Sequence, residues 1–119
     1  MGVVNIKIER GDVVLVDFEP VKGSEQGKIR PALIMQNNIL NKYSPTTIVA
    51  PLTSKIYKEE YPTNVEVSKR ESNLDKDSTI LLNQIRTIDK SRIIKSLTNL
   101  DGYVMKKVEM AIKVSLGLN

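Results

Sequence analysis

Short runs of apolar and β-branched residues, separated by polar turns, recur along the chain before residue 90. Runs of about four to eight such residues between turn signals are typical of β-strands. The pattern predicts strands at residues 12–18, 29–36, 46–52, 64–67 and 79–88. Proline has no backbone N–H to give to a sheet, so Pro51 is expected at a sheet edge.

The segments between these runs are polar. Residues 54–62 and 69–76 are predicted to be a charged loop and a turn, and 37–45 a loop with room for one helical turn. Asp89 can cap a short helix at 90–93. Residues 1–9 are interpreted as a loose or edge-pairing arm.

The C-terminal segment changes to helical periodicity. Asp101 stands where an N-cap would start a helix that runs to about Leu116. Within it, one face gathers Val104, Val108, Ala111, Ile112, Ser115 and Leu116. Packing on the strands explains this face, and a further role at a subunit interface is an equally open alternative. Short strands followed by a terminal helix favour a small curled β-sheet or barrel.

The 119 residues suffice for one domain, 1–119, without linker or repeat. Lysine and arginine exceed aspartate and glutamate by 18 to 14, and the net charge of +4 mildly favours a polyanionic partner. No run reaches the roughly 18 apolar residues of a membrane span, and residues 1–9 lack a signal peptide's apolar core. We therefore expect a cytoplasmic protein.

The chain contains neither histidine nor cysteine. The commonest general acid/base and metal ligand is thus missing, as are thiolate catalysis and the usual zinc sites. The acidic residues are scattered, and no phosphate-binding glycine loop is present. The sequence predicts no metal and no cofactor, so catalysis must use carboxylates, hydroxyls, lysine, arginine or tyrosine.

The segment between the first two strands concentrates polar chemistry, in Ser24, Glu25, Gln26, Lys28 and Arg30. Loops carried by a rigid scaffold are where function usually lies. Pro31 biases Arg30 toward extended geometry at the start of the second strand. A guanidinium there offers a planar fork of donors that suits phosphate oxygens.

Further motifs follow in a fixed order. They are Arg10-Gly11-Asp12-Val13, Gly23-Ser24-Glu25-Gln26, Arg30-Pro31, Ser44-Pro45-Thr46, Thr53 and Asn83-Gln84-Ile85-Arg86-Thr87-Ile88-Asp89. Together they resemble the MazF/PemK family of toxin endoribonucleases over nearly the whole chain. The resemblance implies a mainly β protein with helices, an SH3-like small β-barrel with a C-terminal helix, that forms a two-fold homodimer.

The resemblance also implies an activity, which is metal-independent, sequence-selective cleavage of single-stranded RNA. The 2′-hydroxyl attacks the adjacent phosphate and leaves a 2′,3′-cyclic phosphate and a 5′-hydroxyl. A cognate antitoxin with an acidic, disordered C-terminal segment is expected to cover the basic RNA groove. Two other functions stay open: a non-catalytic nucleic-acid- or peptide-binding module on the same barrel, and topoisomerase inhibition, as in a toxin family of related fold.

Residue roles follow from matching the motifs. Arg30 and Thr53 match the family's catalytic arginine and threonine, and Glu25 is a candidate general base. The residues assigned to RNA contact are Ser24, Gln26, Lys28, Gln84 and Arg86. A regular strand would turn Gln84 and Arg86 to one face and Asn83 to the other. Asn83 departs from the family, since many members carry an acidic residue there, and Ile29 stands where some carry histidine. The loop tyrosines Tyr43, Tyr57 and Tyr61 can stack on bases or pack locally.

Overall fold

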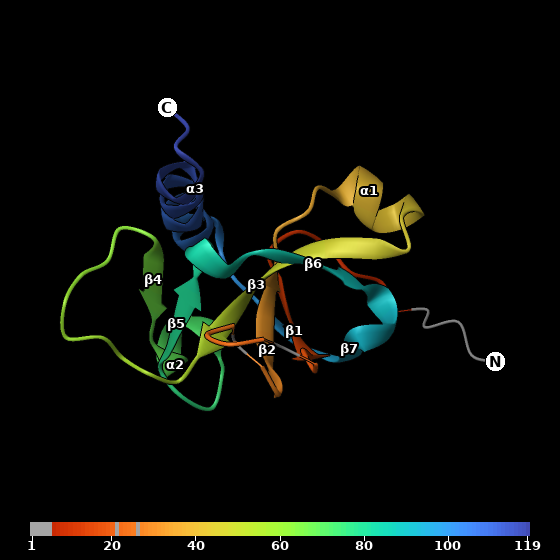
Figure 1. The fold of residues 1–119 in the computed structure, drawn as a ribbon, viewed down its shortest axis with the longest axis horizontal. Helices are drawn as coiled ribbons and strands as arrows, with labels where there is room; N and C mark the ends of the chain where they lie inside the picture. The colour runs from red at the N-terminus through yellow and green to blue at the C-terminus, as the bar shows by residue number, and fades with distance from the viewer. Residues whose placement is uncertain (1–5, 21, 26) are drawn as a thin grey trace.

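The computed structural model describes residues 6–20, 22–25 and 27–119, and Figure 1 shows their arrangement. The strands are β1 (Asp12–Asp17), β2 (Ile29–Ile34), β3 (Thr46–Thr53), β4 (Asn64–Val67), β5 (Ser78–Leu81), β6 (Arg86–Asp89) and β7 (Ile93–Asn99). The helices are α1 (Asn38–Tyr43), α2 (Lys69–Ser72) and α3 (Gly102–Leu116), with 3-10 turns η1 (Leu82–Gln84) and η2 (Lys90–Arg92).

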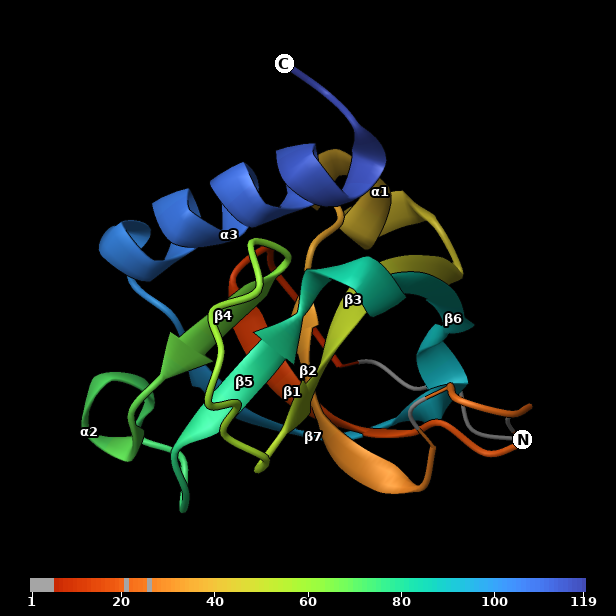
Figure 2. The same ribbon diagram turned by 60° about the vertical axis from the view of Figure 1, so that its left-hand side comes forward.

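All strands belong to one antiparallel sheet in the order β4-β5-β3-β2-β1-β7, and β6 pairs with β3 beside this path. The sheet is strongly twisted, and α3 lies across one side of it (Figure 2). Since β4 and β7 are outer strands, the hydrogen-bonded ladder does not close. The small barrel expected from the sequence is therefore a curled, open sheet with a terminal helix.

Alternating side chains give the sheet two hydrophobic cores. One core lies between the sheet and α3 and includes Val13, Leu33 and Leu52, with Val104 and Val108 from the helix. The second core lies on the opposite face and contains Val14, Val16, Phe18, Ala32, Ile34, Val49, Ile88 and Ile93, with Ile8 from the N-terminal segment. The period of two along each strand explains this division.

The strand expected at 79–88 is interrupted, which corrects the sequence prediction. Residues 78–81 form β5, the 3-10 turn η1 follows, and β6 starts only at Arg86. The two strands occupy different parts of β3: β6 pairs with Thr46 to Val49, and β5 pairs with Leu52 and Thr53. Turn η1 is the step from one pairing site to the next.

Pro51 explains how β3 accommodates this change of partner. The expectation of a sheet edge was wrong, because β3 is an inner strand and Pro51 is buried opposite Ala32 of β2. On its other side Pro51 falls between the last β6 pair, at Val49, and the first β5 pair, at Leu52. The residue without an N–H thus occupies the gap where no ladder bond is required.

The expected terminal helix is confirmed as α3. The Asp101 side chain accepts a hydrogen bond from Val104 N at 3.0 Å, and Gly117 ends the helix with a left-handed φ of 70°. The predicted cap at Asp89 is also present, because its side chain accepts from Ser91 N at 2.8 Å. Strand β7 was missed by the sequence analysis.

The N-terminal segment is described from residue 6 onward, and residues 1–5 of the expected arm lie outside the described part. Residues 6–9 form no strand, although Ile8 is buried in the second core. No helix within the described residues has the length and apolar character needed to cross a membrane.

Candidate active site

Arg30 stands at the start of β2, opposite Val16 of β1, and its side chain is half-buried. Its Nε donates to the carbonyl oxygen of Gly27 at 2.7 Å, and Nη1 reaches the carbonyl oxygen of Leu52 in β3 at 3.5 Å. The guanidinium is therefore held between the end of the loop and the end of β3. These contacts use Nε and one Nη1 hydrogen, and no described residue accepts from Nη2.

Thr53 is the last residue of β3 and follows Leu52, whose carbonyl oxygen Arg30 Nη1 reaches. The recorded pairing of Ala32 with Pro51, continued by two residues in its antiparallel register, sets Arg30 opposite Thr53. Opposite residues share a face, with Cβ atoms about 4.5–5.5 Å apart. The Thr53 hydroxyl accepts from Lys55 N at 3.2 Å, which leaves its own hydrogen available for donation.

The loop residues predicted for the site are all exposed where the structure describes them. The Glu25 carboxylate accepts from Lys22 N at 2.7 Å, so it caps a turn within the loop. Lys28 has a left-handed φ of 65°, and its N–H donates to the Glu19 carboxylate at 2.9 Å. Ser24 is exposed beside Glu25, while Gln26 lies outside the described residues.

A cavity of about 650 Å³ joins this loop to the segment around η1. It is lined by Ser24 and Glu25 of the loop, by the stretch from Asn83 to Thr87, and by Pro51 near the end of β3. Four predicted site residues thus meet in one cavity: Ser24, Glu25, Gln84 and Arg86. Arg30 and Thr53 are absent from its lining, but Thr53 lies on the same face of β3 as Pro51, two residues further along.

The position of Asn83 corrects a further expectation. Alternation along one long strand would have turned Asn83 away from Gln84 and Arg86. Because η1 interrupts the strand, Asn83 is exposed and lines the same cavity as the other two. The uninterrupted apolar run from Ile80 to Leu82, which does not alternate, was the sequence signal that could have revealed this break.

Phe18 is a site residue that the sequence analysis missed. Its ring is fully buried in the second core, and the Arg86 guanidinium carbon lies 5.5 Å from the ring centroid. A cation over an aromatic face is held by the ring quadrupole. Arg86 is itself opposite Val49 on the face away from α3. Phe18 therefore fixes the direction in which Arg86 enters the cavity.

The charged side chains around the site are Lys28, Arg30, Arg86 and Arg92, together with Glu19 and Glu25 of the loop and Asp89 at the end of β6. Just behind Arg86, hydrogen bonds from the side chain and backbone of Ser91 lower the pKa of Asp89, helped by the positive charge of Arg92. No group of three or more acidic side chains among the described residues is placed to hold a metal ion.

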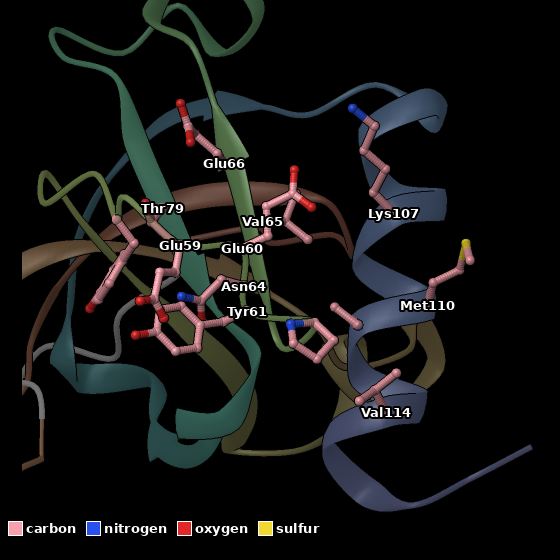
Figure 3. Close-up of a pocket in the computed structure, with 13 residues that line it drawn as sticks. Glu59, Glu60, Tyr61, Asn64, Val65, Glu66, Thr79, Lys107, Met110 and Val114 are labelled. Carbon is pink, nitrogen blue, oxygen red and sulfur yellow. The ribbon is translucent and has the colours of Figure 1, made fainter.

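A separate cavity of about 620 Å³ lies between β4, the 54–62 loop and α3 (Figure 3). Tyr61 and Asn64 line one side, and Met110 and Val114 of α3 line the other. Tyr57 and Tyr61 pack edge to face with ring centroids 5.6 Å apart. Of the two alternatives left open by the sequence, base stacking and local packing, this contact corresponds to local packing. Met110 is 70% exposed and Val114 53%, which leaves this side of α3 without a partner in the described residues.

Comparison with solved structures places the fold among known toxins. The crystal structure of MazF from Deinococcus radiodurans matches with a TM-score of 0.82 at 26% identity and covers 96% of this chain and 100% of that one. A mycobacterial endoribonuclease in complex with its cognate antitoxin matches with a TM-score of 0.77 at 23% identity, covering 94% and 97%. The expected fold class is confirmed, although the sheet is open.

Sequence comparison leads to the family itself. Residues 9–116 match the model of the PemK-like, MazF-like toxins of type II toxin–antitoxin systems. Endoribonuclease MazF of Staphylococcus saprophyticus subsp. saprophyticus is 56% identical over 112 residues, which cover 94% of this chain and 93% of that protein. The chain belongs to the PemK-like, MazF-like toxin family, as its motifs suggested.

Proposed function

We propose that this chain is an endoribonuclease toxin that cleaves single-stranded RNA in the cytoplasm at selected sequences, without a metal ion. Its membership of the toxin family and its 56% identity to a protein named Endoribonuclease MazF support the enzyme class. The observation that carries the proposal is the contact of Arg30 Nη1 with the carbonyl oxygen of Leu52, the neighbour of Thr53, close to the cavity that Pro51, Ser24 and Glu25 line.

The proposed reaction is an internal transfer within the RNA. The 2′-oxygen attacks the neighbouring phosphorus, the bond from phosphorus to the 5′-oxygen breaks, and a 2′,3′-cyclic phosphate and a 5′-hydroxyl result. The 2′-hydroxyl loses its proton to a base, and the departing 5′-oxygen gains one. Since the nucleophile belongs to the substrate, the protein's task is orientation and charge stabilisation.

Arg30 is assigned to the negative charge that builds on the phosphate. Its contacts to Gly27 and Leu52 carbonyl oxygens hold the guanidinium in place before substrate arrives, which avoids reorganisation during the reaction. Thr53 is assigned to donate its free hydroxyl hydrogen to a phosphate oxygen or to hold the 2′-hydroxyl. Glu25 is the candidate base. Its carboxylate accepts a hydrogen bond from Lys22 N in this structure, and RNA binding must reorient it toward the 2′-hydroxyl.

RNA is proposed to lie along the cavity between the loop and η1. Ser24, Gln84 and Arg86 are the described candidates for contacts there, and Gln26 is the remaining loop candidate. Lys28 is exposed nearby and suited to backbone phosphates. Asn83 adds an amide to the cavity wall, so we include it among the groups that select the bases.

Two partners complete the proposal. A cognate antitoxin with an acidic, disordered C-terminal segment would compete with RNA for this surface. An antitoxin partner is supported by the mycobacterial endoribonuclease of the same fold, which was solved in complex with its cognate antitoxin. The chain is proposed to act as a homodimer. The exposed apolar side chains of α3, including Met110 and Val114, are consistent with a further contact surface.

The test is incubation of purified protein with a mixed RNA pool in excess EDTA, reading the ends at each cut. Wild type should make discrete cuts that end in cyclic phosphate and 5′-hydroxyl. Arg30→Ala should be slower by about 10²–10³-fold, the usual cost of one preorganised donor, whereas Arg70→Ala, on exposed α2, should match wild type. A folded wild-type protein that binds RNA but leaves the pool intact would replace this proposal with a binding module.

A further inference from the structure

The loop that carries Ser24 and Glu25 is tied together where it leaves the sheet. Phe18 N donates to the carbonyl oxygen of Lys28 at 3.0 Å, and Lys28 N donates to the Glu19 carboxylate at 2.9 Å. We call Phe18, Glu19 and Lys28 the loop base. These contacts continue the pairing of β1 and β2 beyond its last recorded pair, Asp17 with Ile29.

Arg92, which is distant in the sequence, forms hydrogen bonds with the backbone of this loop base. It is half-buried at the end of η2, and its Nη1 donates to the carbonyl oxygen of Asp17 at 3.1 Å and to that of Glu19. One terminal nitrogen carries two hydrogens, so a single NH₂ group can serve both carbonyls. The backbone on either side of Phe18 is thereby fixed to η2.

The same short stretch of chain that carries Arg92 also carries Arg86. Strand β6 begins at Arg86 and leads directly into η2, which ends at Arg92. Arg86 lies over the Phe18 ring, and Arg92 holds the carbonyls on both sides of Phe18. The loop base and the β6–η2 segment therefore contact each other twice, once through the Phe18 ring and once through its flanking backbone.

The lining of the candidate cavity comes from the chain next to these two contacts, namely the loop that the loop base anchors and the stretch that leads into β6. The loop supplies Ser24 and Glu25, and the other stretch supplies Asn83 to Thr87. We propose that Arg92 is a positioning residue that sets the distance between these two parts of the lining by fixing the loop base against the β6–η2 segment. The proposal rests on the proposed RNA cleavage, although its structural part can be measured without it.

The expected effect is on substrate binding more than on the chemical step. Without Arg92 the loop would populate several arrangements, and only the fraction with the right spacing would bind RNA. Losing two hydrogen bonds of ordinary net strength should reduce that fraction about tenfold or more. Arg30 and Thr53 stand on paired strands, whereas Gly27, which accepts from Arg30 Nε, and Glu25 belong to the loop. We therefore expect a smaller loss in kcat than in binding.

The kinetic test compares Arg92→Ala and Arg92→Lys with wild type, using a short RNA with one cut site and Arg70→Ala as the charge-matched control. Arg92→Ala should raise KM about tenfold, with kcat within about threefold. Arg92→Lys should recover part of the loss, because an ammonium can reach the carbonyls but lacks the rigid guanidinium. Arg70→Ala should match wild type.

Salt separates positioning from simple attraction of RNA. The effect of a lost charge on RNA binding becomes smaller at high ionic strength, because salt screens the attraction. The effect of a misplaced loop on binding does not depend on salt in this way. The KM ratio between Arg92→Ala and wild type should therefore persist when salt is raised. A ratio that returns to one at high salt would overturn the proposal, as would an unchanged KM or a fall in kcat alone.

Amide hydrogen exchange at Lys28 tests the proposal without RNA. Its N–H is held by Glu19, so releasing the loop base should speed its exchange about tenfold in Arg92→Ala, while core amides such as Val108 stay protected. Unchanged exchange at Lys28 refutes the positioning role, whatever the kinetics show. If Lys28 exchanges faster in Arg92→Ala but the wild-type protein does not cut RNA, the positioning role of Arg92 at the loop base is supported and only the proposed RNA cleavage is rejected. If Arg92→Ala fails to fold, Arg92→Lys provides both readouts.

Discussion

Coupling between Arg30 and Thr53 is the sharpest consequence of their facing positions. If both side chains act on one phosphate, removing either should spoil the contribution of the other. The two changes are Arg30→Ala, which removes the guanidinium, and Thr53→Val, which keeps the shape and removes the hydroxyl. The double variant completes a thermodynamic cycle for the transition state.

The magnitude follows from the geometry. Arg30→Ala should cost about 3–4 kcal/mol of transition-state stabilisation, as for one preorganised donor. Thr53→Val should cost about 1.4–2.7 kcal/mol, or 10- to 100-fold, because a neutral hydroxyl gives a weaker bond to phosphate. Since opposite Cβ atoms lie about 4.5–5.5 Å apart, the double variant should fall short of the sum by about 1–2 kcal/mol, most of the Thr53→Val effect.

The assay is single-turnover cleavage of a short RNA, from which the free energies are obtained as ratios of kcat/KM. Thermal unfolding of each variant checks the fold, because Arg30 also contacts the carbonyls of Gly27 and Leu52. Arg30→Ala combined with Thr98→Val on β7 is the matched control and should be additive. Additivity within about 0.5 kcal/mol for Arg30 and Thr53 would refute their action on one phosphate.

Two further predictions concern stability. Asp101→Ala removes the cap that accepts from Val104 N and should lower the free energy of unfolding, measured by urea titration, by about 1 kcal/mol. Asp75→Ala, in an exposed turn, is the control and should leave this free energy unchanged. Equal effects of the two changes would show that the cap contributes nothing. The lowered pKa of Asp89 means that its stabilisation is present above the ordinary carboxyl pKa of about 4 and is lost as pH falls through the lower folded value. Asp89→Asn should therefore reduce the loss of stability between pH 4 and more acidic conditions, and an identical acid profile would contradict this assignment.

Some elements could be predicted from the sequence because their signals are local. Strand β4 and helix α3 match the expected bounds closely, since one is flanked by clear turn residues and the other by a cap and a C-terminal glycine. Strand β7 gave no such signal. It is an outer strand whose residues after Ile93 are mostly exposed, so no alternation marks it.

The residues proposed for the site came from motifs, whereas the way in which they surround a cavity had no sequence signal. The motifs proposed Arg30 and Thr53, and continuing the β2–β3 register by two residues sets them opposite each other. The bend at η1 depends on β3 having two successive partners, which no local pattern encodes. Phe18 looked like an ordinary core residue, because its contact with Arg86 joins segments far apart in the chain.

The division of β3 between two partners has a consequence for how such a toxin can diversify. Thr53 is carried by the half of β3 that pairs with β5, whereas Arg86 stands on β6, which pairs with the other half. A change of length or sequence in η1 can therefore remodel the wall that faces the bases while the residues assigned to the chemistry keep their places. Under the proposed roles, the residues that select the bases at η1 and the Arg30–Thr53 pair stand on different strand pairings, so sequence selectivity could change while that pair stays in place.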